Sequence, residues 1–142
     1  MLENYLISIS GKQEYDGDLG EINLTTYGSY RSENGRQVIA YREYGEGGGP
    51  VVTSVLKIEP NRVEMMHTGD STRLILEEGT RNYGEYDTGF GNLMLGVFTD
   101  EITSTLGKRG GDLKIRYTLD INSGFTSKNE LSITVREAKR NV

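Results

Sequence analysis

The chain of 142 residues contains no cysteine and no tryptophan, and it has only one histidine and two prolines. Because cysteine is absent, disulfides, thiolate chemistry and zinc sites built on cysteine are excluded. No stretch approaches the roughly 20 apolar residues of a membrane span. Residues 1–5 also lack the basic and apolar regions of a signal peptide. We therefore expect a cytoplasmic protein with no membrane partner.

The charge balance is acidic, with a formal net charge of -5 and a sequence pI of about 5.0. Such a surface repels duplex nucleic acid on average, and it also repels an anionic membrane. The basic pair Lys108 and Arg109 is flanked by glycines and is interpreted as a solvated turn. We therefore expect no nucleic-acid partner.

The most informative pattern is the alternation of apolar and polar residues. Its clearest stretch, 113–121, places leucine, isoleucine or tyrosine at every second position, and 131–135 repeats the pattern after a turn. A period of two puts alternate side chains on opposite faces of an extended strand, so that one face is buried. The pattern predicts an all-β protein made of half-buried strands.

Nine turn-like clusters divide the chain into ten such stretches. Asn34-Gly35 is the strongest of them, because this dipeptide readily adopts the positive φ angles of a type I′ hairpin turn. We predict one domain, residues 1–142, folded as an antiparallel meander barrel of about 8–10 strands. Closure removes the exposed edges of a meander, and a barrel of this size leaves room for a pocket. The turn clusters are 16–18, 33–35, 46–50, 60–61, 68–70, 78–79, 89–91, 107–111 and 122–124.

Three features qualify this pattern. Glycines fall inside apparent strands, where they permit the tight bends that a closing sheet needs. Residues 51–58 are apolar at positions of both parities, which indicates either a strand covered on both sides or a surface for assembly, such as a homodimer. Residues 99–107 fit either a continued strand, which we favour, or a short helix capped by Asp100. The glycines are Gly11, Gly20, Gly28 and Gly96.

Several segments together resemble the YwiB-like family, small bacterial proteins of unknown function with a calycin-like, lipocalin-type barrel. The sharpest element is 86–91, which reads Tyr-Asp-Thr-Gly-Phe-Gly; 63–69, 74–79, 111–121 and 129–135 follow the family order, as do three shorter segments upstream. His67 stands where arginine is common in the family, and Gly89 stands where proline is common. The resemblance implies a calycin-like barrel and leaves the activity open.

No motif in the chain specifies a reaction. A Ser-His-Asp triad would need His67, but no Gly-x-Ser-x-Gly elbow accompanies it. The sequence around Asp16 lacks the later residues of an EF-hand, and 45–49 lacks the Gly-Lys-Ser/Thr ending of a phosphate-binding loop. The acidic pairs Glu77/Glu78 and Glu85/Asp87 fit exposed strand ends. We expect no catalytic residue, no metal site and no cofactor.

The nine tyrosines are the one enriched residue type with a possible binding role. A tyrosine gives a pocket an apolar wall with a polar tip, although tyrosines are also ordinary strand formers, as we expect for Tyr83 and others. Our first hypothesis is a non-catalytic barrel that binds a small, partly apolar ligand. The alternatives are an interaction or assembly module without a ligand, and an enzyme that uses carboxylates or the histidine. The candidate ligand-binding residues are Tyr41, Glu43, His67, Tyr86, Thr88 and Tyr117.

Overall fold

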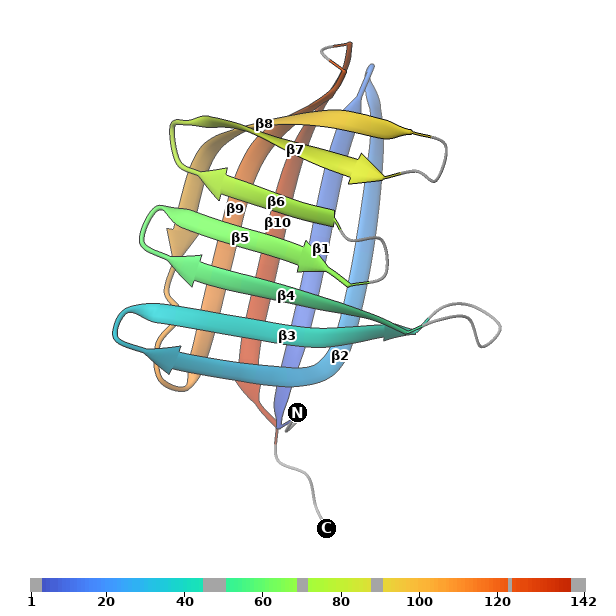
Figure 1. The fold of residues 1–142 in the computed structure, drawn as a ribbon. Helices are drawn as coiled ribbons and strands as arrows, with labels where there is room; N and C mark the ends of the chain where they lie inside the picture. The colour runs from blue at the N-terminus through green and yellow to red at the C-terminus, as the bar shows by residue number, and fades with distance from the viewer. Residues whose placement is uncertain (1–3, 45–50, 69–71, 88–90, 123, 139–142) are drawn as a thin grey trace.

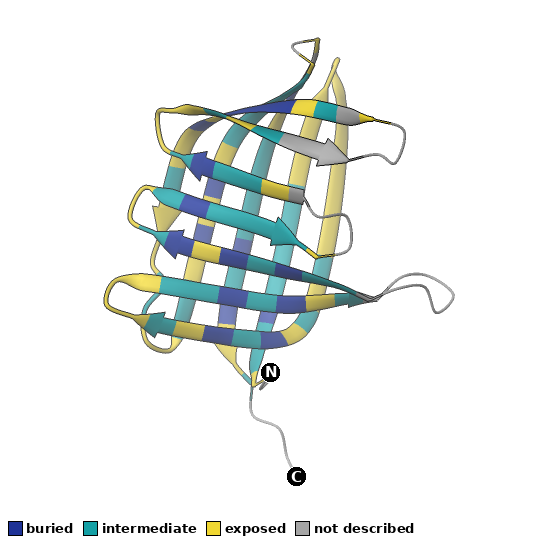
Figure 2. Cartoon of the chain, in the orientation of Figure 1, coloured by how far each residue is buried: buried dark blue, intermediate teal, exposed yellow. Residues whose placement is uncertain are grey.

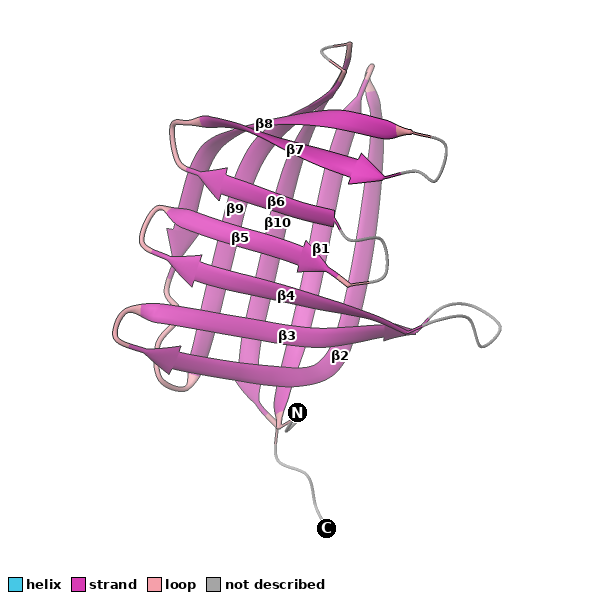
Figure 3. Ribbon diagram, in the orientation of Figure 1, coloured by secondary structure: helices cyan, strands magenta, loops and turns pink. Residues whose placement is uncertain are grey.

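The computed structural model describes residues 4–44, 51–68, 72–87, 91–122 and 124–138, and these fold into ten strands (Figure 1). The described residues contain no helix, so none of them forms a helix that could cross a membrane (Figure 3). The strands are β1 (Tyr5–Tyr15), β2 (Asp18–Glu33), β3 (Arg36–Tyr44), β4 (Val51–Glu59), β5 (Arg62–His67), β6 (Thr72–Glu77), β7 (Arg81–Asp87), β8 (Asn92–Ser104), β9 (Gly110–Ile121) and β10 (Phe125–Glu137).

All ten strands belong to one antiparallel sheet with the order β6-β5-β4-β3-β2-β1-β10-β9-β8-β7. Each strand pairs with its neighbours in sequence except that β6 and β7 do not pair with each other, and β1 also pairs with β10, which joins the two ends of the chain inside the sheet. Five of the nine predicted turns, 16–18, 33–35, 60–61, 78–79 and 107–111, lie within the described residues and mark connections between strands. The other four, 46–50, 68–70, 89–91 and 122–124, lie wholly or partly outside the described residues. The Asn34-Gly35 turn has φ angles of 50° and 76°, as the type I′ prediction requires. The predicted all-β meander is confirmed.

The two terminal strands of the sheet, β6 and β7, approach each other and nearly close it into a barrel. A short backbone ladder spans the connection: the Gly79 N–H donates to the Thr99 carbonyl at 2.8 Å, and the Thr99 N–H donates to the Thr80 carbonyl at 3.3 Å. The register of β8 against β9 shifts between Thr99 and Glu101, which is a bulge that bends β8 at this point. The favoured strand interpretation of this segment is confirmed through Ser104.

The core lies inside the barrel and is built from the alternate, inward-facing residues of the strands (Figure 2). The two-sided apolar segment 51–58 faces this core with Leu56 and Ile58, which are buried, while Lys57 is exposed on the outer face. One face of this segment therefore packs on the core. These side chains give no support to the interpretation of the segment as an assembly surface. The largest fully buried side chains are Ile7, Ile39, Leu56, Ile58, Val63, Leu76, Val97, Thr99, Leu113, Ile115, Ile133 and Val135.

Strand β2 forms the corner of the barrel. Its first half runs beside β1, and its second half turns into the layer of β3 (Figure 1). Gly28 is the residue at which the two pairings meet. A Cβ atom there would lie 2.4 Å from Ile7 Cδ1 and 2.5 Å from the Ala40 carbonyl oxygen, so the corner needs glycine.

One end of the barrel is closed by tyrosines near this corner. The rings of Tyr5 and Tyr30 pack edge to face with centroids 5.3 Å apart. The Tyr30 hydroxyl then donates a hydrogen bond of 2.6 Å to the Gly107 carbonyl in the connection between β8 and β9. This contact ties the two sides of the barrel together at that end.

Candidate functional site

Two of the candidate residues, Tyr41 and His67, lie in one row across the inner wall, with Ser54 between them. Tyr41 on β3 is directly opposite Ser54 on β4, and Ser54 is directly opposite His67 on β5. Directly opposite residues of an antiparallel pair share a face, so the three side chains point to the same side of the sheet. Glu43 lies two residues further along β3, on the same face and opposite Val52.

This row is packed into the core. Tyr41 is 6% exposed and belongs to the central apolar cluster, Ser54 is 0% exposed, and His67 and Glu43 are half-buried. Burial raises the pKa of the Tyr41 phenol, a contact with the Ser54 hydroxyl opposes the rise, and the charge of Glu43 adds to it. That contact falls short of a hydrogen bond, because Ser54 Oγ has no hydrogen-bond partner among the described residues. Tyr41 and Ser54 are thus buried parts of the core.

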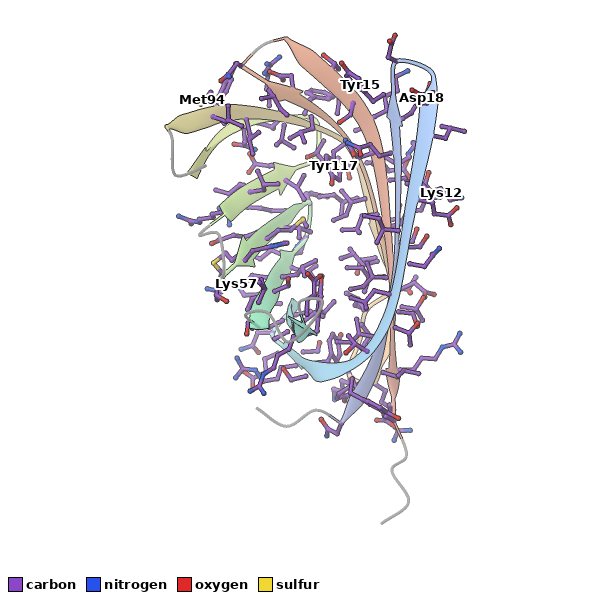
Figure 4. The ribbon with its side chains drawn as sticks, turned by 90° about the vertical axis from the view of Figure 1, so that its right-hand side faces the viewer. Lys12, Tyr15, Asp18, Lys57, Met94 and Tyr117 are labelled. Carbon is purple, nitrogen blue, oxygen red and sulfur yellow. The ribbon has the colours of Figure 1, made fainter. Side chains whose placement is uncertain are left out.

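A second polar row crosses the opposite part of the barrel. Thr99 on β8 is opposite Tyr117 on β9, Tyr117 is opposite Asn129 on β10, and Asn129 is opposite Gln13 on β1. In Figure 4 the Tyr117 side chain points into the barrel, whereas Lys12, the neighbour of Gln13 along β1, points to the outside. The second row therefore faces inward, as the alternation requires.

Beside this second row the inner wall contains a recess of about 460 Å³. Two of its inward positions are glycines, Gly11 on β1 and Gly20 on β2. A Cβ atom at Gly11 would meet nothing within 4 Å, and one at Gly20 would meet only a carbonyl oxygen at 4.0 Å. The missing side chains leave the space open. The other inward residues along the recess are Gln13, Ile22, Tyr117, Leu119, Asn129 and Leu131.

A smaller hollow of about 290 Å³ adjoins this recess and shares Gln13 and Leu119 with it. Its other residues are Tyr15, Ile121, Thr126 and Ser127, which lie where β1 and β9 end and β10 begins. The wall of the smaller hollow is mostly apolar. Together the two spaces follow the inner face of the four long strands, away from the packed row that contains Tyr41.

The polar groups at the recess are uncharged. Burial raises the pKa of the Tyr117 phenol, which therefore stays protonated in neutral solution. The Asn129 Nδ2 donates to the Ser127 carbonyl at 3.2 Å and to the Ser127 Oγ at 3.0 Å, which fixes the amide and turns its oxygen away from Ser127. Alternation places the charged neighbours Lys12, Glu21 and Glu130 on the outer face.

The structure separates the predicted site residues. Tyr41, Glu43 and His67 share one inner face, but Tyr117 lies in the other row, beside the recess. The Tyr86 side chain and the whole of Thr88 lie outside the described residues, so their candidate roles stay predictions. Tyr83, which we expected to be an ordinary strand former, is 66% exposed on the outer face of β7, where the Arg81 guanidinium lies over its ring.

The sequence analysis missed Gln13, Asn129 and the two recess glycines. The signal was present: Gln13 and Gly11 continue the inward series that begins with the first strand, and Asn129 continues the series of 131, 133 and 135 toward its N-terminus. A polar or absent side chain at an inward position marks a place that the core does not fill.

Of the acidic pairs considered for catalysis, only Glu77 and Glu78 have described side chains, and neither lines the recess. Glu78 is exposed, and its Oε2 accepts the Ile102 N–H at 3.1 Å in the bulged part of β8. The side chains of Glu85 and Asp87 lie outside the described residues. Within the described part of the chain there is no group of three histidine, aspartate or glutamate side chains that could hold a metal ion.

The ten-stranded antiparallel meander, nearly closed and with a recess in its inner wall, defines the chain as a calycin-like β-barrel. Residues 7–133 match the family model described as a domain of unknown function, DUF1934, and the chain belongs to this family. The fold is similar to the crystal structure of the ywiB protein from Bacillus subtilis, with a TM-score of 0.78 and 22% identity over 95% of this chain and 92% of that one. The expected YwiB-like membership is thereby confirmed. No curated protein matches the sequence.

Proposed function

We propose that this protein binds a small, partly apolar molecule in the recess beside Tyr117 and catalyses no reaction on it. The observation that carries the proposal is the open space of about 460 Å³ beside Gly11 and Gly20, two inward positions where an added Cβ atom would meet no atom closer than 4.0 Å. This volume lies within the range of about 300–1,000 Å³ that is usual for ligand pockets.

The lining favours an uncharged ligand with one polar end. Ile22, Leu119 and Leu131 supply apolar surface, whereas the Tyr117 hydroxyl and the Asn129 amide supply hydrogen-bonding groups. A charged ligand would lose its hydration without meeting a charged side chain among the inward residues that line the recess. That loss of hydration costs several kcal/mol, as for other buried ions. A neutral molecule with a hydroxyl, carbonyl or amide group avoids this cost.

The absence of catalysis is part of the proposal. Tyr117 and Asn129 are neutral, and the lone histidine lies in the packed row with Tyr41, away from the recess. General acid or base catalysis at neutral pH needs a group whose pKa lies near the working pH and that reaches the substrate. The groups described at the recess can orient a ligand by hydrogen bonds and provide no such group.

A fluorescence titration with the neutral apolar probe N-phenyl-1-naphthylamine tests the proposal. We expect saturable binding to the wild-type protein at one site per chain. Gly11→Leu fills the recess without backbone strain, because no atom lies within 4 Å of the Cβ position, and it should weaken probe binding at least tenfold.

The matched control is Ser10→Leu, which adds the same side chain one position earlier on β1, where alternation turns it to the outer face opposite Ser132. This variant should bind the probe like the wild type. Equal binding by Gly11→Leu and Ser10→Leu, or no saturable binding at all, would contradict the proposal.

A further inference from the structure

The first half of β2 is an open edge of the sheet. Residues 18–27 pair with β1 on one side, and β3 begins to pair with β2 only at Gly28. The described residues place no strand against the other side of 18–27. Figure 1 shows this half of β2 standing at the margin of the barrel, behind the hairpins of the front layer. Among the described residues, strand pairing is therefore incomplete along this edge.

The geometry of the β1–β2 hairpin shows which backbone N–H and carbonyl groups of β2 make no hydrogen bond to β1. Asp16 and Gly17 both have positive φ angles, 49° and 83°, so β1 and β2 are joined by a two-residue turn closed by the pair Tyr15 and Asp18. Hydrogen-bonded pairs alternate from that point, and every second residue of β2 directs its N–H and carbonyl away from β1. These outward-directed residues include Leu19, Glu21, Asn23 and Thr25.

This edge has few of the features that usually protect an edge strand, and its charged residues are Asp18, beside the turn, and Glu21. Residues 18–27 contain no lysine, arginine or proline, and their register with β1 is continuous, without a bulge. Two large apolar side chains stand exposed on it: Leu19 at 82% on the outer face and Ile22 at 75% on the inner face. A continuous edge that carries exposed apolar side chains is a template for pairing with another strand.

We propose that the occupant of this edge is the same edge of a second copy of the chain, paired antiparallel about a two-fold axis at Asn23. The choice of a second copy follows from the register. With Asn23 opposite its own counterpart, Leu19 meets Tyr27 on the outer face and Ile22 meets Leu24 on the inner face, so each exposed apolar side chain is covered. Glu21 meets Thr25 and not its own counterpart, which avoids a like-charge pair.

The paired edge lies next to the candidate ligand recess, because Gly20 and Ile22 line that recess. A second copy would extend the sheet across this side and shield the recess from solvent. The pairing does not depend on ligand binding, and the ligand proposal does not depend on the pairing.

Cross-linking tests the register directly, because the chain has no cysteine of its own. In the proposed dimer, Asn23→Cys places the two cysteines directly opposite each other. Their Cα atoms would be about 5.5 Å apart, a separation that suits a disulfide. We expect a covalent dimer under mild oxidation. Glu21→Cys and Thr25→Cys should each cross-link at least tenfold less when alone and should cross-link with each other when mixed.

Light scattering after size-exclusion chromatography gives an independent readout of the full chain. The wild type should have twice the monomer mass of 15.8 kDa. Asn23→Pro removes an N–H that points away from β1 and should raise the dimer dissociation constant at least tenfold, while Asn23→Thr keeps the N–H and should stay dimeric. Wild-type protein that stays monomeric at all concentrations, or Asn23→Cys that cross-links no better than Glu21→Cys alone, would overturn the inference.

Discussion

Arg81 on β7 and Asp120 on β9 form an ion pair that spans the intervening strand β8, with Nη2 and Oδ1 2.7 Å apart. Directly beneath the pair is Gly96, whose Cβ position lies 2.5 Å from Asp120 Oδ1 and 2.8 Å from Arg81 Nη2. The absent side chain lets the two charged groups meet across three strands. The pair therefore fastens β7, the terminal strand of the sheet, to β9 across β8.

Gly96→Ala should lower the free energy of unfolding by about 1–3 kcal/mol, as expected when a methyl group is forced into an occupied space. Urea denaturation measures the change. Arg81→Ala alone should cost less than about 1 kcal/mol, because the pair is partly solvated. The double variant should cost less than the sum of the two, since the clash with the guanidinium is then gone. Strict additivity would show that the methyl group does not displace Arg81.

Gly28→Ala and Gly11→Ala should have opposite effects, although both glycines face inward on the β1–β2 hairpin. The new methyl at Gly28 would collide with the Ala40 carbonyl and Ile7, and we expect a loss of at least about 2 kcal/mol. At Gly11 nothing lies within 4 Å, so alanine should leave stability unchanged or raise it by up to about 1 kcal/mol. Thermal unfolding of both variants checks the contrast, and an equal loss at the two positions would contradict this view of the corner.

Much of the fold could be predicted from the sequence because alternation and turn chemistry are local. The positions of the five described turns, the type I′ geometry at Asn34 and the inward series of 113–121 all depend on neighbours within a few residues. The role of Gly28 could be foreseen as a bend. The atoms that exclude a side chain there, Ile7 Cδ1 and the Ala40 carbonyl oxygen, come from strands placed by long-range pairing.

The candidate site was harder to predict because it depends on which inward positions meet across the barrel. Tyr41 and His67 lie on inward faces, which the sequence left open, but Tyr41 is packed into the apolar core and neither residue lines the recess. Tyr117 lies beside a recess only because Gly11 and Gly20 occur at inward positions on two strands that are distant from it in sequence. A single sequence contains no signal for that juxtaposition.

Ser54→Ala should be neutral or should raise the free energy of unfolding by up to about 1 kcal/mol. The Ser54 hydroxyl is fully buried and has no hydrogen-bond partner among the described residues, so its removal relieves a desolvation cost. Ser54→Val, which adds volume in the packed row with Tyr41, should be destabilising. Chemical denaturation compares the two. A loss above about 2 kcal/mol for Ser54→Ala would instead show that the hydroxyl is satisfied in solution, as by a bound water.

Stability should fall at alkaline pH. Burial raises the pKa of Tyr30, Tyr41 and Tyr117 above 10.0, so these phenols hold their protons longer in the folded chain than in the unfolded one. Their contribution is complete below the unfolded pKa of about 10 and is lost as the pH rises through the folded pKa values. Urea unfolding between about pH 8 and pH 11 should show a decline that is shallower in Tyr117→Phe.

The control for the alkaline experiment is Tyr83→Phe, which removes the hydroxyl of an exposed tyrosine and leaves the buried phenols in place. Its unfolding free energy should follow that of the wild type across the range. A decline that is identical in wild type, Tyr117→Phe and Tyr83→Phe would assign alkaline unfolding to groups other than Tyr117.

Native mass spectrometry of protein purified from the cells that naturally make it tests most directly whether a small molecule binds in the recess. The wild type should carry a small uncharged molecule that is released on denaturation, and Ser10→Leu should carry the same molecule. Gly11→Leu, purified in the same way, should be free of it. A wild-type protein that bears no added mass, or a Gly11→Leu variant that retains the same molecule, would contradict the account.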